Sequence, residues 1–283
     1  MKFPALVHII IVLIAITGIL GVDNGLAADN SASALPKFGD PRYRPDNPGK
    51  PIKSIRFLTG TDFPPFNYIQ SDGRLGGFHV ELARSICRVL TAICSIEARP
   101  FTELRDRLAK KEGDAILAGL AVTAAGRKTL SFTNSYLRLP ARFVAKSSGD
   151  KDPAGGNLDG KWISVIAGSA HQAFAAIYFP NAKFAFYTDA AAARAAVRDG
   201  DVDLHFGDGL SLAFWLTGES SKACCRFVGG PYMDEKYFGA GLAAATRRED
   251  EVLVSALNFA LAELQSNGRI SELYLRYFPM NFY

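Results

Sequence analysis

The sequence predicts an α/β fold made of two lobes. Short apolar runs of strand length alternate with segments of helical periodicity over residues 54–278. This pattern occurs twice, and a glycine-rich stretch at residues 147–157 separates the two copies. Strands that alternate with helices of about 10 to 15 residues are typical of mostly parallel sheets covered by helices on both faces. We therefore expect one such sheet in each lobe.

The first copy of the pattern starts at Ile55, where a polar stretch ends. Its first helix is indicated by apolar residues at helical spacing, among them Val80, Ala83 and Ile86. Its second helix ends before Gly113, and a buried strand follows. We expect strands at residues 54–59, 95–98, 115–118 and 142–146, and helices at residues 80–90 and 102–110.

The second copy repeats this outline and ends in two helices. The longer of these has Val252, Ala256 and Phe259 on one face. We expect strands at residues 162–167, 184–186 and 202–206, an extended segment at 238–246, and helices at 170–178, 190–198, 249–266 and 270–278.

The amino terminus has the layout of a secretory signal peptide. Lys2 precedes an apolar run at residues 6–20, and small side chains stand at the two positions before the cut that a signal peptidase reads. The run is about 15 residues long, shorter than the roughly 20 that a spanning helix needs. We therefore expect residues 1–27 to be cleaved and the mature protein to be periplasmic. A membrane anchor is the alternative. Residues 28–52 are polar and predict a linker or surface arm.

Composition narrows the function classes. The net charge is only +4 over 283 residues, and no block of five or more Lys or Arg occurs, so nucleic acid is not an expected partner. The four histidines show neither metal-ligand nor catalytic-triad spacing, and no Gly-x-Ser-x-Gly motif occurs. We expect no metal, no cofactor and no nucleophilic catalysis.

The four cysteines predict disulfides, because their number is even and export leads to an oxidising compartment. Cys87 and Cys94 close a short loop around the end of a helix, which is geometrically easy. Cys224 and Cys225 are adjacent, and the sequence leaves open whether they form a vicinal disulfide or stay reduced.

Two α/β lobes that face each other form a cleft. In such sheets ligands bind beyond the carboxyl ends of the strands, where loops and helix amino termini meet. The pattern therefore favours a protein that holds one small molecule between its lobes.

Four segments carry short motifs in a fixed order. One is the strand end Phe63-Pro64-Pro65-Phe66, followed by a helix start at residues 76–83. The other three are residues 111–123 with Phe132 and Tyr136, residues 158–169, and residues 256–278. Each is weak alone. Together they resemble the family 3 extracellular solute-binding proteins, the amino-acid receptors of ABC importers.

This resemblance implies a type II periplasmic binding protein fold with two crossover hinge strands, near residues 139–146 and 237–245. Lobe 1 would comprise residues 53–141 and 242–283, and lobe 2 residues 142–241. A monomer would close on a small polar ligand and deliver it to an ABC permease. The spacing of Cys87 and Cys94 is similar to the disulfide loop of the histidine and lysine/arginine/ornithine-binding branch, which supports a disulfide there.

The resemblance implies that aromatic residues of lobe 1 contact the ligand. Phe63 matches an aromatic that stacks on the ligand side chain, and Phe66 and Phe101 are further candidates. Core packing is the structural alternative for all three. Asp62 precedes Phe63 and is expected at the same edge of the cleft.

The next motif would supply backbone and hydroxyl groups. Gly119, Ala121 and Thr123 are expected as ligand-binding positions at a strand end. Members of the family hold the ligand α-carboxylate with a hydroxyl and an arginine. Here Ala121 stands at the hydroxyl position and Gly126 at the arginine position. Arg127 comes one residue late, and it either reaches the ligand or is a solvated surface residue.

In lobe 2, Gly168, Ser169 and Ala170 match a loop that meets the ligand at a helix amino terminus, where free N–H groups favour an anion. Ser169 acts as a helix cap in the alternative interpretation. His171 is expected on the helix surface. Asp208 matches the aspartate that pairs with the ligand amino group, and in the alternative it stabilises its own turn.

Asp208 without an arginine at position 126 indicates a ligand that has a cationic nitrogen and need not carry a standard α-carboxylate, such as an amine, an opine-like conjugate or a modified amino acid. We expect a solute-binding receptor and not an enzyme. One alternative is an enzyme similar to the cyclohexadienyl dehydratases, which would need a general acid in the cleft. Another is a periplasmic sensor or accessory protein on the same fold.

Overall fold

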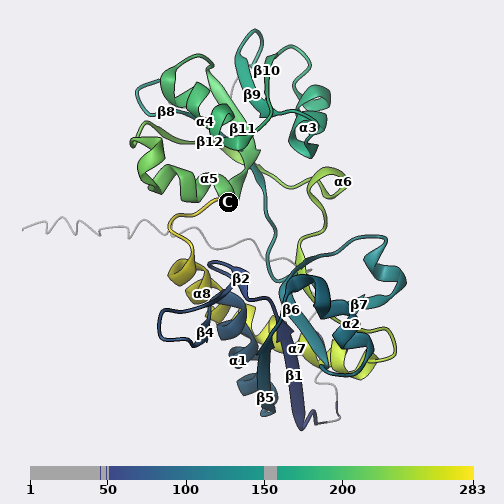
Figure 1. Ribbon diagram of the computed structural model, residues 1–283. Helices are drawn as coiled ribbons and strands as arrows, with labels where there is room; N and C mark the ends of the chain where they lie inside the picture. The colour runs from purple at the N-terminus through teal and green to yellow at the C-terminus, as the bar shows by residue number, and fades with distance from the viewer. Residues whose placement is uncertain (1–44, 46–48, 50, 150–157) are drawn as a thin grey trace, which may run out of the picture. The chain divides into compact units, whose positions relative to one another are not determined.

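The computed structural model describes residues 45, 49, 51–149 and 158–283. They form two five-stranded sheets and one three-stranded sheet, and helices pack against each five-stranded sheet (Figure 1). We call the sheet that contains β1, with its helices, lobe 1, and the sheet that contains β8, with its helices, lobe 2. The expected α/β fold with two sheet-based lobes is confirmed. The expected signal peptide and almost all of the expected arm lie outside the described residues.

The sheet of lobe 1 has the strand order β5-β1-β6-β13-β7. β1 is parallel to β5 and β6, and β13 is antiparallel to both β6 and β7, so every strand except β13 points the same way. The strands are β1 (Ser54–Thr59), β5 (Ile93–Ala98), β6 (Ala115–Ala121), β7 (Leu130–Phe132) and β13 (Leu242–Arg247), and β2 (Asp62–Phe63), β3 (Asn67–Ile69) and β4 (Leu75–Gly76) form the small sheet. The helices are α1 (Phe78–Leu90), η1 (Phe101–Glu103), α2 (Leu104–Ala109), η2 (Gly126–Lys128), α7 (Glu251–Ser266) and α8 (Arg269–Tyr277).

Lobe 1 has a core on both faces of its sheet. Ile55 and Phe57 of β1 are buried in the cluster that contains residues of α1, α7 and α8. Leu58, the next residue, belongs to a second cluster with Leu104 and Leu108 of α2. A strand covered on both faces needs apolar residues on both, which explains why the adjacent Phe57 and Leu58, which point to opposite faces, are both apolar and buried.

The sheet of lobe 2 repeats this arrangement with the order β10-β9-β11-β8-β12. Here β8 is antiparallel to both β11 and β12, while β9 is parallel to β10 and β11. The strands are β8 (Ala141–Lys146), β9 (Trp162–Ile166), β10 (Lys183–Tyr187), β11 (Leu204–Asp208) and β12 (Cys225–Tyr232). The helices are α3 (Ala170–Tyr178), α4 (Ala190–Asp199), α5 (Gly209–Thr217), η3 (Glu219–Ser221) and α6 (Glu235–Phe238).

Lobe 2 is also packed on both faces. Phe143 of β8 and Phe206 of β11 are buried with Phe174 of α3. On the other face, Val144 of β8 is buried with residues of α4 and α5, among them Val197. The chain passes from the sheet of lobe 1 to that of lobe 2 between β7 and β8, and it returns between β12 and β13. The lobe limits at residues 141/142 and 241/242 and the hinge strands stay predictions.

All four cysteines are bonded. Cys87 at the end of α1 forms a disulfide with Cys94 of β5, with a Cα–Cα distance of 6.2 Å, which confirms the expected pairing. Cys224 and Cys225 form a vicinal disulfide at the start of β12, which answers the question that the sequence left open.

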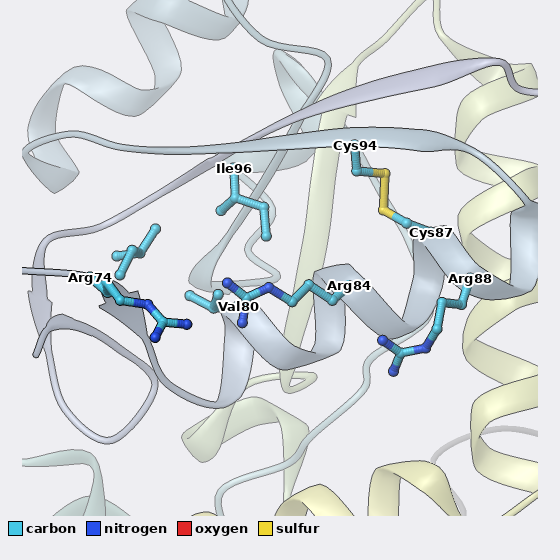
Figure 2. Close-up of a pocket in the computed structure, with 8 residues that line it drawn as sticks. Arg74, Val80, Arg84, Cys87, Arg88, Cys94 and Ile96 are labelled. Atoms are coloured by element: carbon cyan, nitrogen blue, oxygen red, sulfur yellow. A yellow bond between two sulfur atoms is a disulfide. The ribbon is translucent and has the colours of Figure 1, made fainter.

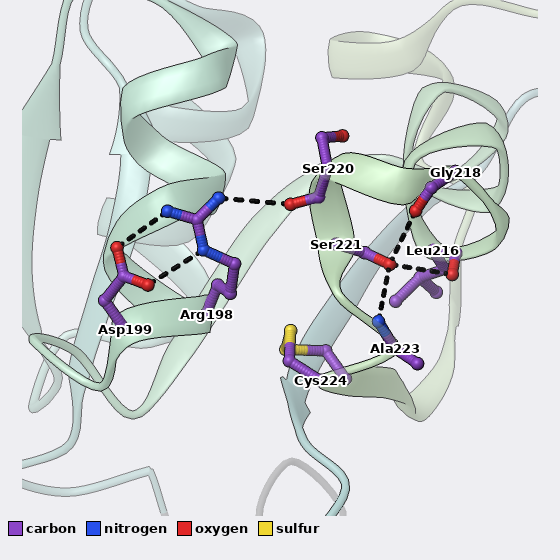
Figure 3. The surroundings of a disulfide bond; sticks show 9 residues. Arg198, Asp199, Leu216, Gly218, Ser220, Ser221, Ala223 and Cys224 are labelled. Carbon is purple, nitrogen blue, oxygen red and sulfur yellow. Dashed lines mark hydrogen bonds and ion pairs between the residues drawn. A yellow bond between two sulfur atoms is a disulfide. The ribbon is translucent and has the colours of Figure 1, made fainter.

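The turn before the vicinal disulfide is held by a serine. The Ser221 hydroxyl faces the carbonyl oxygens of Leu216 and Gly218, at 3.1 and 2.9 Å, and accepts the Ala223 N–H at 3.1 Å (Figure 3). Ser221 is buried, so these contacts satisfy its polar group inside the lobe.

Several elements differ from the sequence prediction. Phe238 belongs to α6 and not to an extended segment, because Asp234 caps a short helix there. β11 ends two residues later than expected, and this makes Asp208 its last residue. The helix α5 was missed because it is apolar on nearly every side and shows no amphipathic period. Strand β12 was not predicted because it contains two adjacent glycines, which weaken the sequence pattern of a strand.

Candidate functional site

Three rings are stacked at one edge of lobe 1. Phe63, in β2, is 42% exposed, and its ring lies 4.8 Å from the ring of Phe66 with an angle of 16° between the planes. Phe66 in turn stacks on His79 of α1 at 4.8 Å and 25°. Because Phe66 is fully buried, it supports Phe63 from below instead of offering a surface of its own. Phe63 is the exposed end of the stack.

His79 at the base of the stack is held by two side chains. Its Nδ1 lies 2.7 Å from Oδ1 of Asn67, and its Nε2 lies 2.8 Å from the Tyr136 hydroxyl. Since the Asn67 oxygen only accepts, the assigned arrangement has Nδ1–H donating to Asn67 and the Tyr136 O–H donating to Nε2. Burial lowers the pKa of His79 to about 3, so the imidazole is neutral at neutral pH. Sequence analysis did not find this network.

Gly119 of β6 lies against the exposed ring. Its φ is +76°, and a Cβ at this position would stand 2.9 Å from Cε1 of Phe63 and 3.4 Å from Cε1 of His79. The lack of a side chain therefore lets the strand backbone approach the ring stack. Of the expected ligand-binding residues, Gly119 and Phe63 are brought into direct contact.

The other expected residues of lobe 1 are spread over neighbouring loops. Asp62 is exposed and lies beside Phe63 in β2. Phe101 is 54% exposed at the start of η1, just after β5. Ala121 is exposed at the end of β6. β5 and β6 both run parallel to β1, so these residues follow the carboxyl ends of neighbouring strands.

Thr123 and Arg127 have local structural roles. The Thr123 hydroxyl accepts the N–H of Gly126 at 3.0 Å, and the Arg127 N–H donates to the Thr123 carbonyl at 3.0 Å. The exposed Arg127 lines a groove with residues of β7 and α7, among them Phe132 and Glu251. The structure thus groups Arg127 with α7, which favours the surface interpretation over a role beside Phe63.

In lobe 2, Ser169 caps α3. Its Oγ accepts the Gln172 N–H at 3.1 Å and donates to the carbonyl of Ile166 at 2.6 Å. The Gly168 N–H donates to Oε1 of Gln172 at 2.7 Å. Within the described chain, the N–H groups of the exposed Ala170 and of His171 have no acceptor, as is usual in a first helical turn. These two groups are the free donors of the loop.

His171 is half-buried and does not lie free on the helix surface, so that expectation was wrong. Its ring stacks on Phe238 at 5.2 Å and 28° and meets the edge of Phe206 at 5.8 Å. Burial lowers the pKa of His171 to about 4. It is one member of an aromatic cluster with Phe174 of α3, and this cluster explains why the side chain turns inward.

Asp208 is the last residue of β11 and the N-cap of α5. Its Oδ1 accepts the N–H of Ser211 at 2.7 Å. The side chain is half-buried, and burial raises the pKa of Asp208 although the Ser211 N–H and the Arg194 charge both act to lower it. The structural alternative for Asp208 is thus realised at one oxygen, while the other oxygen has no hydrogen bond within the described chain.

Arg194 of α4 is a neighbour of Asp208 that sequence analysis missed. Its guanidinium donates to the Ser211 hydroxyl. Burial lowers the pKa of Arg194, and the attraction of Asp208 opposes this shift. The sequence held a signal for it, because Arg194 lies beside the stripe of buried residues on α4, three positions before Val197.

A separate groove of about 540 Å³ lies on lobe 1 beside the Cys87–Cys94 disulfide (Figure 2). Arg74, Arg84 and Arg88 line it. Arg84 pairs with Glu81 at 2.7 Å, and Arg74 lies 3.8 Å from Asp72, so much of this positive charge is balanced. Among the residues that the structure covers, there is no group of three His, Cys, Asp or Glu that could hold a metal, and no helix is long and apolar enough to cross a membrane.

Comparison with known proteins assigns the family. The model of the bacterial extracellular solute-binding proteins, family 3, matches residues 55–280, so the chain belongs to this family. It is 28% identical to the L-arginine-binding protein of Pseudomonas aeruginosa, over 89% of this chain and 96% of that protein. It is 27% identical to the histidine-binding periplasmic protein of Escherichia coli, over 82% of this chain and 90% of that protein. The protein is therefore a ligand-binding receptor of the kind that serves ABC transporters.

Solved structures agree on the fold. The L-cystine solute receptor of Neisseria gonorrhoeae matches with a TM-score of 0.70 at 16% identity, over 81% of this chain and 94% of that one. Substrate-binding domain 2 of Lactococcus lactis GlnP matches with a TM-score of 0.66 at 16% identity, over 87% and 100%. At these identities the matches establish the type II periplasmic binding protein fold and nothing about the ligand.

Proposed function

We propose that this protein is a periplasmic receptor that binds a small polar ligand with a cationic nitrogen, namely an amino acid, an amine or an amino-acid derivative, and delivers it to an ABC permease. The observation that carries the proposal is the pair of features at strand ends: the exposed Phe63 ring in lobe 1 and the Asp208 carboxylate in lobe 2. A flat ring takes the apolar or guanidinium part of a ligand by stacking, and a half-buried carboxylate favours a cation.

Three further points support this proposal. The relatives named above bind arginine or histidine, and both amino acids carry an ammonium group and a planar group in the side chain. The Gly119 backbone packs beneath the ring, which keeps Phe63 in place without a competing side chain. The free N–H groups of Ala170 and His171 offer donors to an anionic or carbonyl group of the same ligand.

The remaining parts of the proposal concern the whole chain. We propose cleavage after Ala27, release into the periplasm and action as a monomer. We also propose that Asp62, Phe101, Ala121, Gly168 and Ser169 border the ligand, since they lie at the same ends of their sheets as Phe63 and Asp208. Phe66, Thr123 and Arg127 would act behind this border or outside it.

An enzyme on this fold is the rival function, because a general acid needs a raised pKa and burial raises that of Asp208. The Ser211 N–H and the Arg194 charge both oppose this shift, which favours a carboxylate that binds a cation. Incubation of the mature protein with prephenate and arogenate, followed by product detection, tests the rival, and turnover would replace the receptor proposal.

A thermal-shift screen of amino acids, amines and opines tests the receptor proposal directly. A ligand at about 100 times its Kd adds about 2.7 kcal/mol to the free energy of unfolding, which is easily seen as a rise in Tm. We expect a hit among the compounds that carry a cationic nitrogen, confirmed by calorimetric titration. A screen in which only anions or neutral sugars stabilise the protein would contradict the proposal.

A further inference from the structure

The guanidinium of Arg194 and the carboxylate of Asp208 are both hydrogen-bonded to the same residue of α5, Ser211. Arg194 donates to Oγ of Ser211, and the backbone N–H of Ser211 donates to Oδ1 of Asp208 at 2.7 Å. The two charges are therefore neighbours at the first turn of α5. This turn follows the carboxyl end of β11, the edge of the sheet where α/β proteins bind ligands.

The two charges are close but do not form an ion pair with each other. The structure has no direct ion pair between Arg194 and Asp208 over the residues it describes; Ser211 separates them. The attraction between them nevertheless opposes the effect of burial on the pKa of each. Both side chains are half-buried, so each can still meet a ligand. A charge couple of this kind has one position for a cation and one for an anion.

Arg194 also has unused hydrogen-bonding capacity. A guanidinium has five N–H donors, and within the described chain the only acceptor bonded to that of Arg194 is the Ser211 hydroxyl. Its Nε is buried and has no partner. A buried donor without an acceptor is costly, and a charged one more so. A carboxylate is the group whose two oxygens fit the planar fork of arginine.

In lobe 1, neither position 126 nor Arg127 offers an arginine to bind a ligand carboxylate beside Phe63. Gly126 has no side chain, and a Cβ there would stand 3.0 Å from the ring of Phe132, so this position is already filled. Arg127 lines the groove beside α7. Within the described part of the chain, Arg194 is therefore the arginine that stands beside a candidate ligand-binding carboxylate.

We infer that Arg194 determines ligand specificity: with Asp208 it binds the two charges of a zwitterionic head group, the ligand ammonium on Asp208 and the ligand carboxylate on Arg194. This inference rests on the proposed function and decides between its ligand classes. It favours an α-amino acid or a conjugate that keeps its carboxylate over a plain amine.

Two pairs of probes test the inference, L-arginine against agmatine and L-histidine against histamine, because the members of each pair differ only in the α-carboxylate. Calorimetric titration of the mature protein is expected to show at least about tenfold tighter binding of the amino acid than of the amine, as a hydrogen bond to a charged group predicts. In R194Q this ratio is expected to fall to within about twofold, and R194K is expected to restore part of it.

Ser211→Ala provides a second variant that keeps both charges and removes the bridge between the helices. It is expected to reduce the ratio by about threefold or more, since Arg194 loses its anchor. Melting curves of the unliganded variants show that they are folded. A merely structural role of Arg194 would lower Tm and weaken both members of a probe pair equally.

The outcomes separate the inference from the function beneath it. If a probe pair binds and R194Q leaves the ratio unchanged, or if wild type binds amine and amino acid equally, the inference is wrong and the receptor function stands. If none of the four probes binds to the wild-type protein, the inference is wrong for arginine and histidine, and the thermal-shift screen still decides the wider ligand class of the proposed function.

Discussion

The ring of Phe63 lies directly over the backbone of Gly119, where a Cβ would stand only 2.9 Å from Cε1 of the ring. This contact joins the small sheet to the central strand β6, and it fixes the exposed end of the ring stack. The shape of the candidate site in lobe 1 therefore depends on a residue that has no side chain.

Gly119→Ala is expected to lower both stability and affinity. Its φ of +76° disfavours any side chain, at a cost of about 1–2 kcal/mol, and the new methyl group would displace Phe63. Gly73→Ala is the matched control, since Gly73 has a φ of +78° and open space around it. We expect the control to lose stability alone, as measured by urea unfolding and calorimetric titration. Equal affinity of the two variants would argue against the role of this contact.

Phe63→Ala and Phe66→Ala are expected to act on different quantities. Phe63 is exposed, so its loss weakens ligand binding by about tenfold with little change in Tm. Phe66 is fully buried, so its loss destabilises the fold by about 3–5 kcal/mol. Calorimetry and urea unfolding on both variants test this division. An unaltered Kd in Phe63→Ala would remove that ring from the site.

Asp208→Asn distinguishes the helix-capping role of Asp208 from the role of its negative charge in ligand binding. Asparagine caps a helix as well as aspartate, so the bond to Ser211 is kept and stability stays within about 0.5 kcal/mol of wild type. Affinity for a cationic ligand is expected to fall at least about tenfold. Asp208→Ala is the control, and it also loses about 1 kcal/mol of cap stability. If Asp208→Asn binds as tightly as wild type, Asp208 is a cap and nothing more.

Stability is expected to fall with pH below about 6.5 because of His79. Burial lowers its pKa from 6.5 in the unfolded chain to about 3 in the fold, so below pH 6.5 the unfolded chain binds a proton that the folded one excludes. The stability from neutral His79 is full above pH 6.5 and is lost progressively down to pH 3. Between pH 6.5 and pH 5 this loss is about 2 kcal/mol.

His79→Gln removes this titration and is expected to flatten the decline measured by urea unfolding at several pH values. His205, which burial also shifts to a pKa of about 3, remains in both proteins and so serves as an internal background. Parallel curves for the variant and wild type would show that His79 does not contribute.

The two disulfides are expected to differ in their effect on stability. Cys87 and Cys94 are 7 positions apart, and a loop of this length predicts about 2.5 kcal/mol of stabilisation through the unfolded chain. Cys224 and Cys225 are adjacent and restrain almost no chain, so about half as much is expected. Paired Cys→Ser variants, compared by urea unfolding, measure both. A larger loss for the vicinal pair would contradict the loop-length argument.

Much of the fold could be predicted from local pattern. Helix α3 has the limits expected from the sequence and begins after its serine cap, and strand β1 also has the expected limits. Helix α5 could not be predicted in this way, because it is buried on most sides and its sequence has no polar face. Missing α5 also meant that Asp208 was not recognised as a helix cap.

Some residues of the candidate site could likewise be predicted from local sequence, and others could not. Phe63, Gly119 and Asp208 stand beside prolines, strand ends and glycines that are visible along the chain. His79 and Arg194 do not, because their roles depend on partners distant in sequence: Tyr136 for His79, and Ser211 for Arg194.

The sequence by itself determined the α/β alternation, the family and the strand ends at which a ligand would be bound, because periodicity and short motifs are local properties of the chain. The tertiary structure alone decided which side chains meet there: that Phe66 lies beneath Phe63, that His171 turns inward, and that Arg194 stands beside Asp208. Burial and hydrogen-bond partnership arise only when distant segments pack together, and they set both the exposure of each ring and the charge that each ionisable group carries.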